Sequence, residues 1–405
     1  MKKIILILII SQFFSISGQA QWYTQQSGMT SALYDIEFIN RNTGWACGVE
    51  GIIKTTNGGI NWVRQSNGVP FEPLFGISPV DSNFVYAVGF FRTYIKSTNG
   101  GSSWFNLDSG MQGDGTYQSV FFLNSKTGWA GYGDGTFFGV RKTTDGGKTF
   151  TSYPTGVPND LYFKDSVNGI GVEEASIVLK TLNGGLNWGY NVLAVSGNFY
   201  RVSFINENTG FTASTRAVYS TNNFGINWDS VGRITPLDID VTSIEFCNEN
   251  TGWAGTTSPV YKTTNGGRDW FLQILTGVVY SIYSYNDSLV WTCGNAGRIW
   301  HTTNGGTSSI QTISNEIPEE FQLNQNYPNP FNSQTKITFN IKHYGKYSMV
   351  IFNNLGQKII EVFSDKLAEG VYETTFDASD LNSGVYFYRL TGNNISLTKK
   401  FVLIK

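Results

Sequence analysis

The side chains that most often carry enzyme chemistry are few in this sequence. Among 405 residues only two are histidines, His301 and His343, which argues against most histidine-based catalysis and the common zinc sites. The sequence contains no Ser/His/Asp set, phosphate-binding loop or metal-binding cluster, and its arginines do not recur at one place. We therefore expect no catalytic residues, cofactor or metal, and we favour a binding protein over an enzyme.

One polar turn motif, by contrast, occurs seven times in the sequence. The pattern T-T-N-G-G-x-x-W occurs at Thr55–Trp62, and we interpret the fifth copy, Ser220–Trp228, as having one inserted residue, so that Asn223 could replace Asn222 as its central residue. The Asn or Asp accepts backbone hydrogen bonds, the second Gly permits positive φ, and the Trp packs on the hairpin. We favour fold-stabilising turns over calcium or sugar sites, with central residues Asn57, Asn99, Asp145, Asn183, Asn222, Asn265 and Asn304.

The spacing of these turns predicts the elements that hold them. Positions 57 and 304 are six repeats apart, or about 41 residues a repeat, which is typical of a four-stranded propeller blade. Each repeat has four strand-like segments, here called A to D. The seventh lacks strand D, and the orphan segment Gln21–Gln26 resembles strand D of the first repeat, Asn61–Gln65. We predict an all-β, seven-bladed β-propeller over residues 21–308, with this N-terminal strand closing blade 7.

The turn resembles the Asp-box, or bacterial neuraminidase repeat (BNR), S-x-D-x-G-x-T-W, with Asn at the Asp position in six of seven copies. Sialidases also carry Asp-boxes, away from their active sites. Residues 22–306 as a whole are similar to the propellers of photosystem II assembly and stability factors and their bacterial relatives. This resemblance implies the fold, and we do not carry the photosynthetic role over.

The N-terminus has the pattern of an export signal. Met1-Lys2-Lys3 is positive, Ile4–Ile10 is apolar, and Gly18-Gln19-Ala20 matches a cleavage site, so residues 1–20 are predicted to be a signal peptide. No later segment is long and apolar enough to span a membrane. The three cysteines are predicted to be small core residues, although a bridge between Cys47 and Cys293 is conceivable.

The C-terminal region differs in composition from the repeats. Residues 309–322 are interpreted as a linker, and six strand-like segments in residues 323–405 suggest a small Ig-like β-sandwich. The run Asn326–Asn332, N-Y-P-N-P-F-N, and the segments Asn354–Gln357 and Leu381–Tyr386 resemble the type A C-terminal sorting domain of type IX secretion. The resemblance implies a Bacteroidetes-type bacterium, a secreted or cell-surface protein, and the secretion machinery and a sortase-like peptidase as partners. An ordinary carbohydrate-binding sandwich is the alternative.

The variable loops suggest where a ligand would bind. The B–C and D–A loops share one face of a propeller, and in blades 2 and 3 they are rich in aromatic residues that could hold a sugar or a protein. Alternatively, these rings pack between blades. The candidate residues are Phe90, Phe91, Arg92, Tyr94, Asp114, Tyr132, Asp134, Phe137 and Phe138. The net charge of −2 gives no attraction for nucleic acid. We expect a monomeric protein- or glycan-binding module, with a glycoside hydrolase or lyase as the alternative.

Overall fold

The structure is a computed structural model. It describes residues 22–65, 72–107, 114–193, 197–215, 217–234, 240–273, 277–306, 310–314, 316–332, 334–378 and 381–404, so the predicted signal peptide lies outside the described residues. The described chain forms two compact units, which divide between residues 306 and 307 and are treated separately below.

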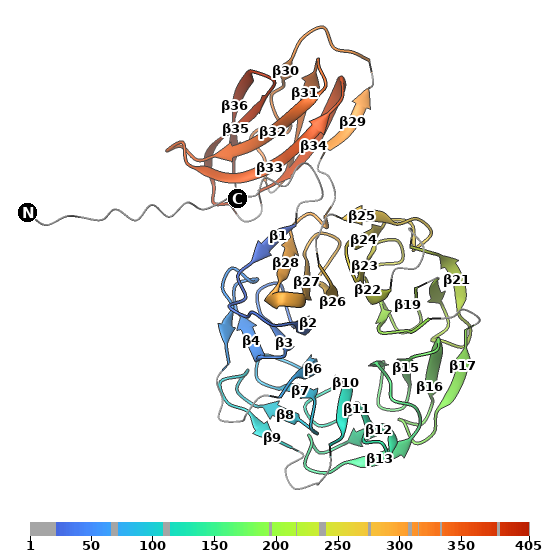
Figure 1. The fold of residues 1–405 in the computed structure, drawn as a ribbon. Helices are drawn as coiled ribbons and strands as arrows, with labels where there is room; N and C mark the ends of the chain where they lie inside the picture. Colours follow the sequence, from blue (N-terminus) through green and yellow to red (C-terminus); the bar gives the residue numbers. More distant parts are fainter. Residues whose placement is uncertain are drawn as a thin grey trace, which may run out of the picture. The chain divides into compact units, whose positions relative to one another are not determined.

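The first unit is a seven-bladed β-propeller (Figure 1). The first three blades are β2 (Leu33–Phe38), β3 (Gly44–Gly48), β4 (Gly51–Thr55) and β5 (Val63–Arg64); β6 (Leu74–Pro79), β7 (Val85–Gly89), β8 (Tyr94–Ser97) and β9 (Phe105–Asn106); β10 (Thr116–Phe122), β11 (Gly128–Gly133), β12 (Phe138–Thr143) and β13 (Thr151–Pro154). The next three are β14 (Asp160–Phe163), β15 (Gly169–Glu173), β16 (Ile177–Thr181) and β17 (Gly189–Val192); β18 (Val202–Phe204), β19 (Gly210–Ala213), β20 (Val218–Thr221) and β21 (Asp229–Gly232); β22 (Val241–Phe246), β23 (Gly252–Thr256), β24 (Val260–Thr263) and β25 (Phe271–Gln273).

The seventh blade joins both ends of this unit. Its strands are β26 (Val279–Ser284), β27 (Val290–Gly294), β28 (Ile299–Thr302) and β1 (Tyr23–Gln25), with the short 3-10 turn η1 (Asn295–Gly297) between β27 and β28. β1 pairs antiparallel with β28, Tyr23 opposite His301. The N-terminal strand therefore supplies the outer strand of the last blade, and the ring is closed by backbone hydrogen bonds.

The repeated turns hold each blade and also link it to its neighbour. In the first turn, Asn57 Oδ1 accepts hydrogen bonds from Thr55 Oγ1 at 3.0 Å and from the Asn61 backbone N–H at 2.9 Å, and Thr55 Oγ1 accepts one from the Gly59 N–H at 2.8 Å. Trp291 on blade 7 donates its indole N–H to the Gly58 carbonyl of this turn at 3.0 Å. Such bonds use polar turn atoms to fix adjacent blades.

The fifth turn corrects our alignment. Its central residue is Asn223, which accepts from Thr221 Oγ1 at 3.0 Å and from the Asn227 N–H at 3.1 Å, so Asn222 does not have that role. No residue is inserted. Phe224 stands where the other turns have their first glycine and takes a φ of 53°. The missing glycine, not an extra residue, makes this copy look irregular in the sequence.

The second unit is a β-sandwich of two four-stranded sheets, with orders β29-β34-β31-β30 and β33-β32-β35-β36. The strands are β29 (Ile310–Ser314), β30 (Gln322–Leu323), β31 (Gln334–Ile341), β32 (Gly345–Phe352), β33 (Lys358–Leu367), β34 (Gly370–Asp377), β35 (Gly384–Gly392) and β36 (Ile395–Leu403). Alternate apolar residues of the two sheets, such as Phe339 and Met349, form one buried core. β29 lies in the span that we interpreted as a linker and pairs with β34, so the sandwich begins earlier than the sequence suggested.

The cysteines are free thiols. Cys47 and Cys293 are buried in adjacent blades and Cys247 is half-buried, so the conceivable bridge is not formed. Cys47 and Cys293 each point their sulfur at a main-chain carbonyl of the next blade, that of Leu74 and that of Leu33. They are core residues, as small apolar side chains usually are.

Candidate functional site at the mouth of the channel

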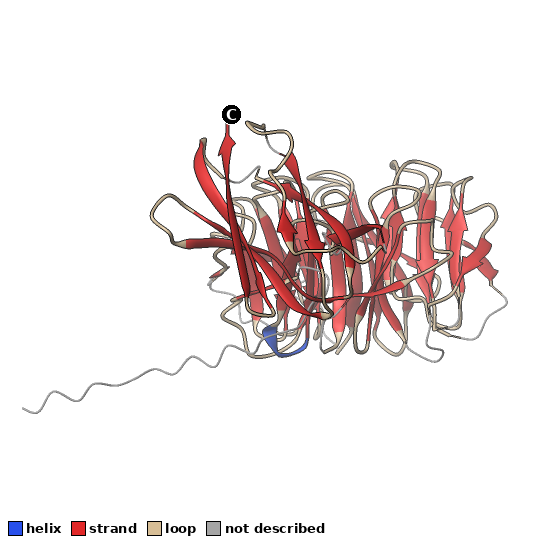
Figure 2. Ribbon diagram, turned by 90° about the horizontal axis from the view of Figure 1, so that it is seen from above, coloured by secondary structure: helices blue, strands red, loops and turns tan. Residues whose placement is uncertain are grey.

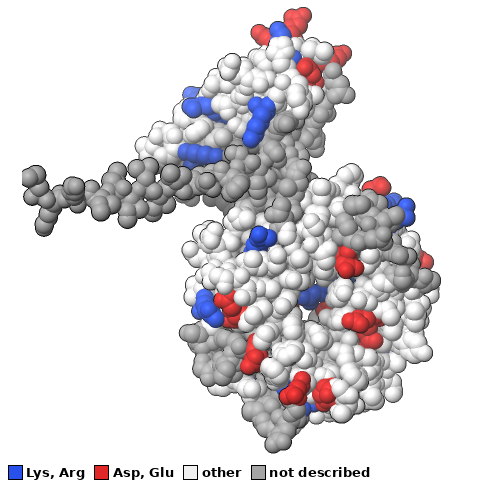
Figure 3. Space-filling view, viewed as in Figure 1, with Lys and Arg blue, Asp and Glu red and all other residues white. Residues whose placement is uncertain are grey.

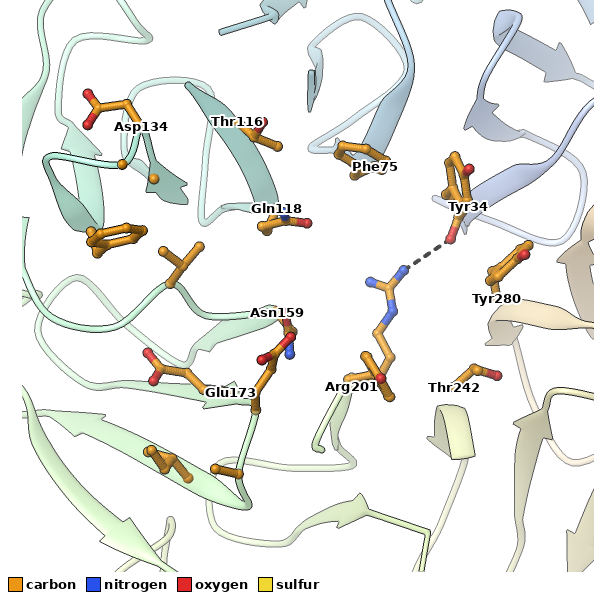
Figure 4. Close-up of a pocket in the computed structure, with 18 of the residues that line it drawn as sticks. Tyr34, Phe75, Thr116, Gln118, Asp134, Asn159, Glu173, Arg201, Thr242 and Tyr280 are labelled. Carbon is orange, nitrogen blue, oxygen red and sulfur yellow. Dashed lines mark hydrogen bonds between the residues drawn. The ribbon is translucent and has the colours of Figure 1, made fainter. Parts of the chain in front are cut away.

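A cavity of about 900 Å³ opens where the innermost strands begin, on the face that carries the B–C and D–A loops. Figure 2 shows the blades edge-on, with their strands running between the two faces of the ring. The cavity combines first residues of A strands with loops of blades 3 and 4 (Figure 4), and its lining includes Tyr34, Phe75, Asp114, Gln118, Asp134, Phe138, Asn159, Glu173, Glu174, Arg201, Thr242 and Tyr280.

One side of this cavity is aromatic. The ring of Tyr34 lies 5.3 Å from that of Phe75 and 5.1 Å from that of Tyr280, tilted by 55° and 59°. All three occupy the same position near the start of strand A in blades 1, 2 and 7, where a bulge at the second strand-A residue interrupts the regular pairing with strand B. These half-buried rings form a continuous apolar wall at the channel mouth.

The opposite side of the cavity is acidic, and its carboxylates are in different states. Asp134 accepts hydrogen bonds from the N–H groups of Thr136 and Phe137, at 3.0 and 2.7 Å, and they lower its pKa. Glu173 is 9% exposed, and its Oε1 has no hydrogen-bond partner among the described residues. Burial raises the pKa of Glu173 to about 7. The carboxylate of Asp134 therefore bonds to its own loop, whereas Glu173 Oε1 remains without a hydrogen bond among the described residues.

Below the mouth, an ion pair crosses the channel. Arg201 of blade 5 donates to Asp35 of blade 1 at 2.8 Å and lies 3.7 Å from Asp160. The same guanidinium also donates to the Tyr34 carbonyl, the bond drawn in Figure 4. Two further carboxyl groups, Glu37 and Glu245, line a cavity of about 290 Å³ here. Desolvation raises the pKa of Glu245 to about 7 and that of Asp160 to about 6, so Arg201 is surrounded by acids that resist ionisation.

The structure divides the candidate residues taken from the sequence into three groups. Asp114, Asp134 and Phe138 line the cavity. Phe90 and Phe91 are exposed and touch each other, and the ring of Phe90 lies 6.2 Å from that of Phe75, but they are outside the cavity lining. Four are buried or partly buried between blades: Arg92, Tyr94, Tyr132 and Phe137. Packing between blades therefore accounts for part of the aromatic loops.

Several cavity residues were not found from the sequence. Tyr34, Phe75 and Tyr280 share one place in the repeat, and an alignment of the A segments would have found them. Arg201 and Glu173 have no local signal, because each is one of many charged residues in a variable position. His301 stacks on Trp291, and burial lowers its pKa to about 4.

Comparison with known families identifies the second unit. Residues 325–405 match the secretion system C-terminal sorting domain family. The protein is therefore secreted, to the cell surface or the medium, and the secretion machinery handles its C-terminal domain. Among the described residues, no helix is long and apolar enough to cross a membrane. No curated protein is similar to this chain in sequence.

Solved structures similar to the chain are β-propellers. "YCF48 bound to D1 peptide" superposes with a TM-score of 0.59 at 18% identity, covering 72% of this chain and 100% of that one. YCF48 from Cyanidioschyzon merolae gives 0.57 at 17%, covering 70% and 98%. The GH74 xyloglucanase from Xanthomonas campestris gives 0.56 at 9%, covering 79% and 59%. At these identities the likeness shows the fold alone.

Proposed function

We propose that the propeller is a non-enzymatic binding module, displayed outside the cell, that holds a protein or glycan ligand in the cavity at the channel mouth. The observation that carries the proposal is this cavity. It is the size of known ligand sites, and it has an aromatic wall with a few polar groups facing it. It also lies on the face where the loops depart most from the repeat.

The fold offers a precedent for this use. YCF48, a propeller of similar architecture, has been solved with a peptide bound. A rigid ring suits recognition, because its side chains are held in place before the ligand arrives and little entropy is lost on binding.

A second candidate function is glycoside hydrolysis. One observation favours it: burial raises the pKa of Glu173 to about 7, a value suited to a general acid. A hydrolase also needs a second carboxylate about 5–10 Å from the first. Asp134 is the candidate for this second carboxylate, but it already accepts hydrogen bonds from the N–H groups of its own loop.

The proposal is tested with the exported full-length protein on a glycan array and a peptide array. Phe138 lines the cavity and is 52% exposed, so Phe138→Ala should weaken binding at least tenfold. Phe271→Ala is the matched control, because Phe271 is 59% exposed on the outer strand β25. Equal binding by wild type and Phe138→Ala would reject this cavity. Release of sugar from a bound oligosaccharide, abolished by Glu173→Gln, would favour the hydrolase.

A further inference from the structure

Glu173 is held in a costly position. It ends strand β15, its backbone carbonyl accepts from the Phe199 N–H at 3.1 Å, and its carboxyl group lies directly against the backbone of Gly156. A Cβ at Gly156 would come within 2.0 Å of Oε2. The carboxyl group is therefore packed against the loop that leads from blade 3 to blade 4, it lines the cavity, and its Oε1 has no hydrogen-bond partner among the described residues. A buried polar atom without a hydrogen-bond partner is energetically unfavourable.

The surrounding charge leaves this cost uncompensated. The described cavity lining has four acidic side chains, Asp114, Asp134, Glu173 and Glu174, and one basic side chain, Arg201. Arg201 is engaged by Asp35 and Asp160 below the mouth. Acidic side chains also surround the central opening on the face seen in Figure 3. A ligand that brings a positive charge would find a counter-charge already in place.

The aromatic wall fits the same kind of ligand. The faces of Tyr, Trp and Phe rings attract ammonium and guanidinium groups. The rings of Tyr34, Phe75 and Tyr280 lean against one another at 55–59°, so they offer edges and partial faces and not one flat platform on which a sugar ring could stack. A slim side chain with a charged end suits this shape better than a pyranose ring.

We propose that the cavity receives a lysine or arginine side chain from a peptide segment of a partner protein, with Glu173 as its counter-charge. This inference rests on the proposed binding function. The basic group would donate a hydrogen bond to the carboxyl group of Glu173, while neighbouring residues of the same peptide would pack on the aromatic wall on the opposite side of the cavity. The free pKa of Glu173, near 7, would fall when the cation binds.

The test uses the full chain and three fluorescent twelve-residue peptides that differ only in carrying four Lys, four Gln or four Glu. We expect the Lys peptide to bind at least tenfold more tightly than the Gln peptide, and the Glu peptide to bind most weakly. Glu173→Gln should reduce the affinity for the Lys peptide about tenfold. Glu207→Gln is the matched control, because Glu207 is exposed in an A–B loop on the other face. Unfolding midpoints of both variants check that they fold.

The outcomes separate the inference from the proposed function. If the Lys peptide does not bind, or binds wild type and Glu173→Gln equally well, the cationic ligand is wrong. Binding of neutral peptides or glycans that is lost in Phe138→Ala would then leave the binding function standing. Preference for a chitosan oligosaccharide over the Lys peptide, lost in Glu173→Gln, would assign the site to an amino sugar and overturn the peptide.

Discussion

Arg201 should contribute strongly to the stability of the ring. Its guanidinium joins blade 5 to blade 1 across the channel and faces the carboxyl groups of Asp35 and Asp160. Replacing it by methionine, Arg201→Met, keeps the bulk of the side chain but leaves those groups and Glu37 without a positive charge. The acids would then have to remain neutral or repel one another.

The size of the effect follows from the distances. At an effective dielectric constant of about 20, a contact of 2.8 Å is worth about 6 kcal/mol and one of 3.7 Å about 4 kcal/mol. Much of this is offset because Arg201 no longer has to be desolvated, and the acids can take up protons. Removing one partner of a buried pair typically costs about 3–5 kcal/mol, and we expect that loss at pH 7.5.

Urea unfolding followed by tryptophan fluorescence measures this loss in the whole chain. All eleven tryptophans lie between Trp22 and Trp300, so the signal reports on the propeller and not on the sandwich. Arg298→Met is the matched control, because Arg298 is exposed and its guanidinium bonds to a loop amide, and it should cost less than about 0.5 kcal/mol. At pH 5 the loss in Arg201→Met should shrink, because Asp160, with a pKa of about 6, is then largely protonated. A loss below about 1 kcal/mol at pH 7.5, or no change between the two pH values, would refute the reasoning.

Three further predictions concern charge, turns and export. Glu245→Gln should stabilise the propeller by roughly 1–2 kcal/mol at pH 8 and by little at pH 5. The folded state raises the pKa of Glu245 to about 7, so the contribution of this residue to stability falls as the pH rises from about 4.5 to 7; an equal difference between wild type and Glu245→Gln at both pH values would contradict this. Asn183→Ala should cost about 1–2 kcal/mol, because the Asn187 N–H and the Thr181 hydroxyl each lose an acceptor. Asn206→Ala, at an exposed position of an ordinary A–B loop, is the control and should cost less. An equal loss in both variants would contradict a special role for the repeated turn. Deleting residues 323–405 should leave the protein in the periplasm by cell fractionation, and normal secretion of the truncated chain would show that the match to the sorting family misleads.

The fold could be predicted from the sequence because the same turn motif occurs seven times at a regular spacing. The regular spacing of the turns indicates four strands in each repeat, and the number of repeats gives the number of blades. The one misaligned turn fails for a local reason: Phe224 takes a left-handed backbone conformation that the pattern reserves for glycine. A sequence pattern matches residue types, so it cannot show that a residue other than glycine adopts the same dihedral angles.

The site was less readable, because it is assembled from different repeats. Arg201 and Asp35 meet although 166 positions separate them, and nothing near either residue indicates the other. The aromatic loops of blades 2 and 3 were predicted to bind a ligand because they depart from the repeat, yet the rings of Tyr94 and Tyr132 are buried between blades. Burial decides whether an aromatic residue is available to a ligand, and burial depends on neighbours that the sequence does not order in space.

The way in which β1 completes the seventh blade has a consequence for the timing of folding. Tyr23 is among the first residues of the propeller to be synthesised, and its partner His301 is among the last. Until both are present, β28 keeps an open edge able to pair with the β1 segment of another molecule. At high concentration the same open edge favours strand exchange between copies of the chain.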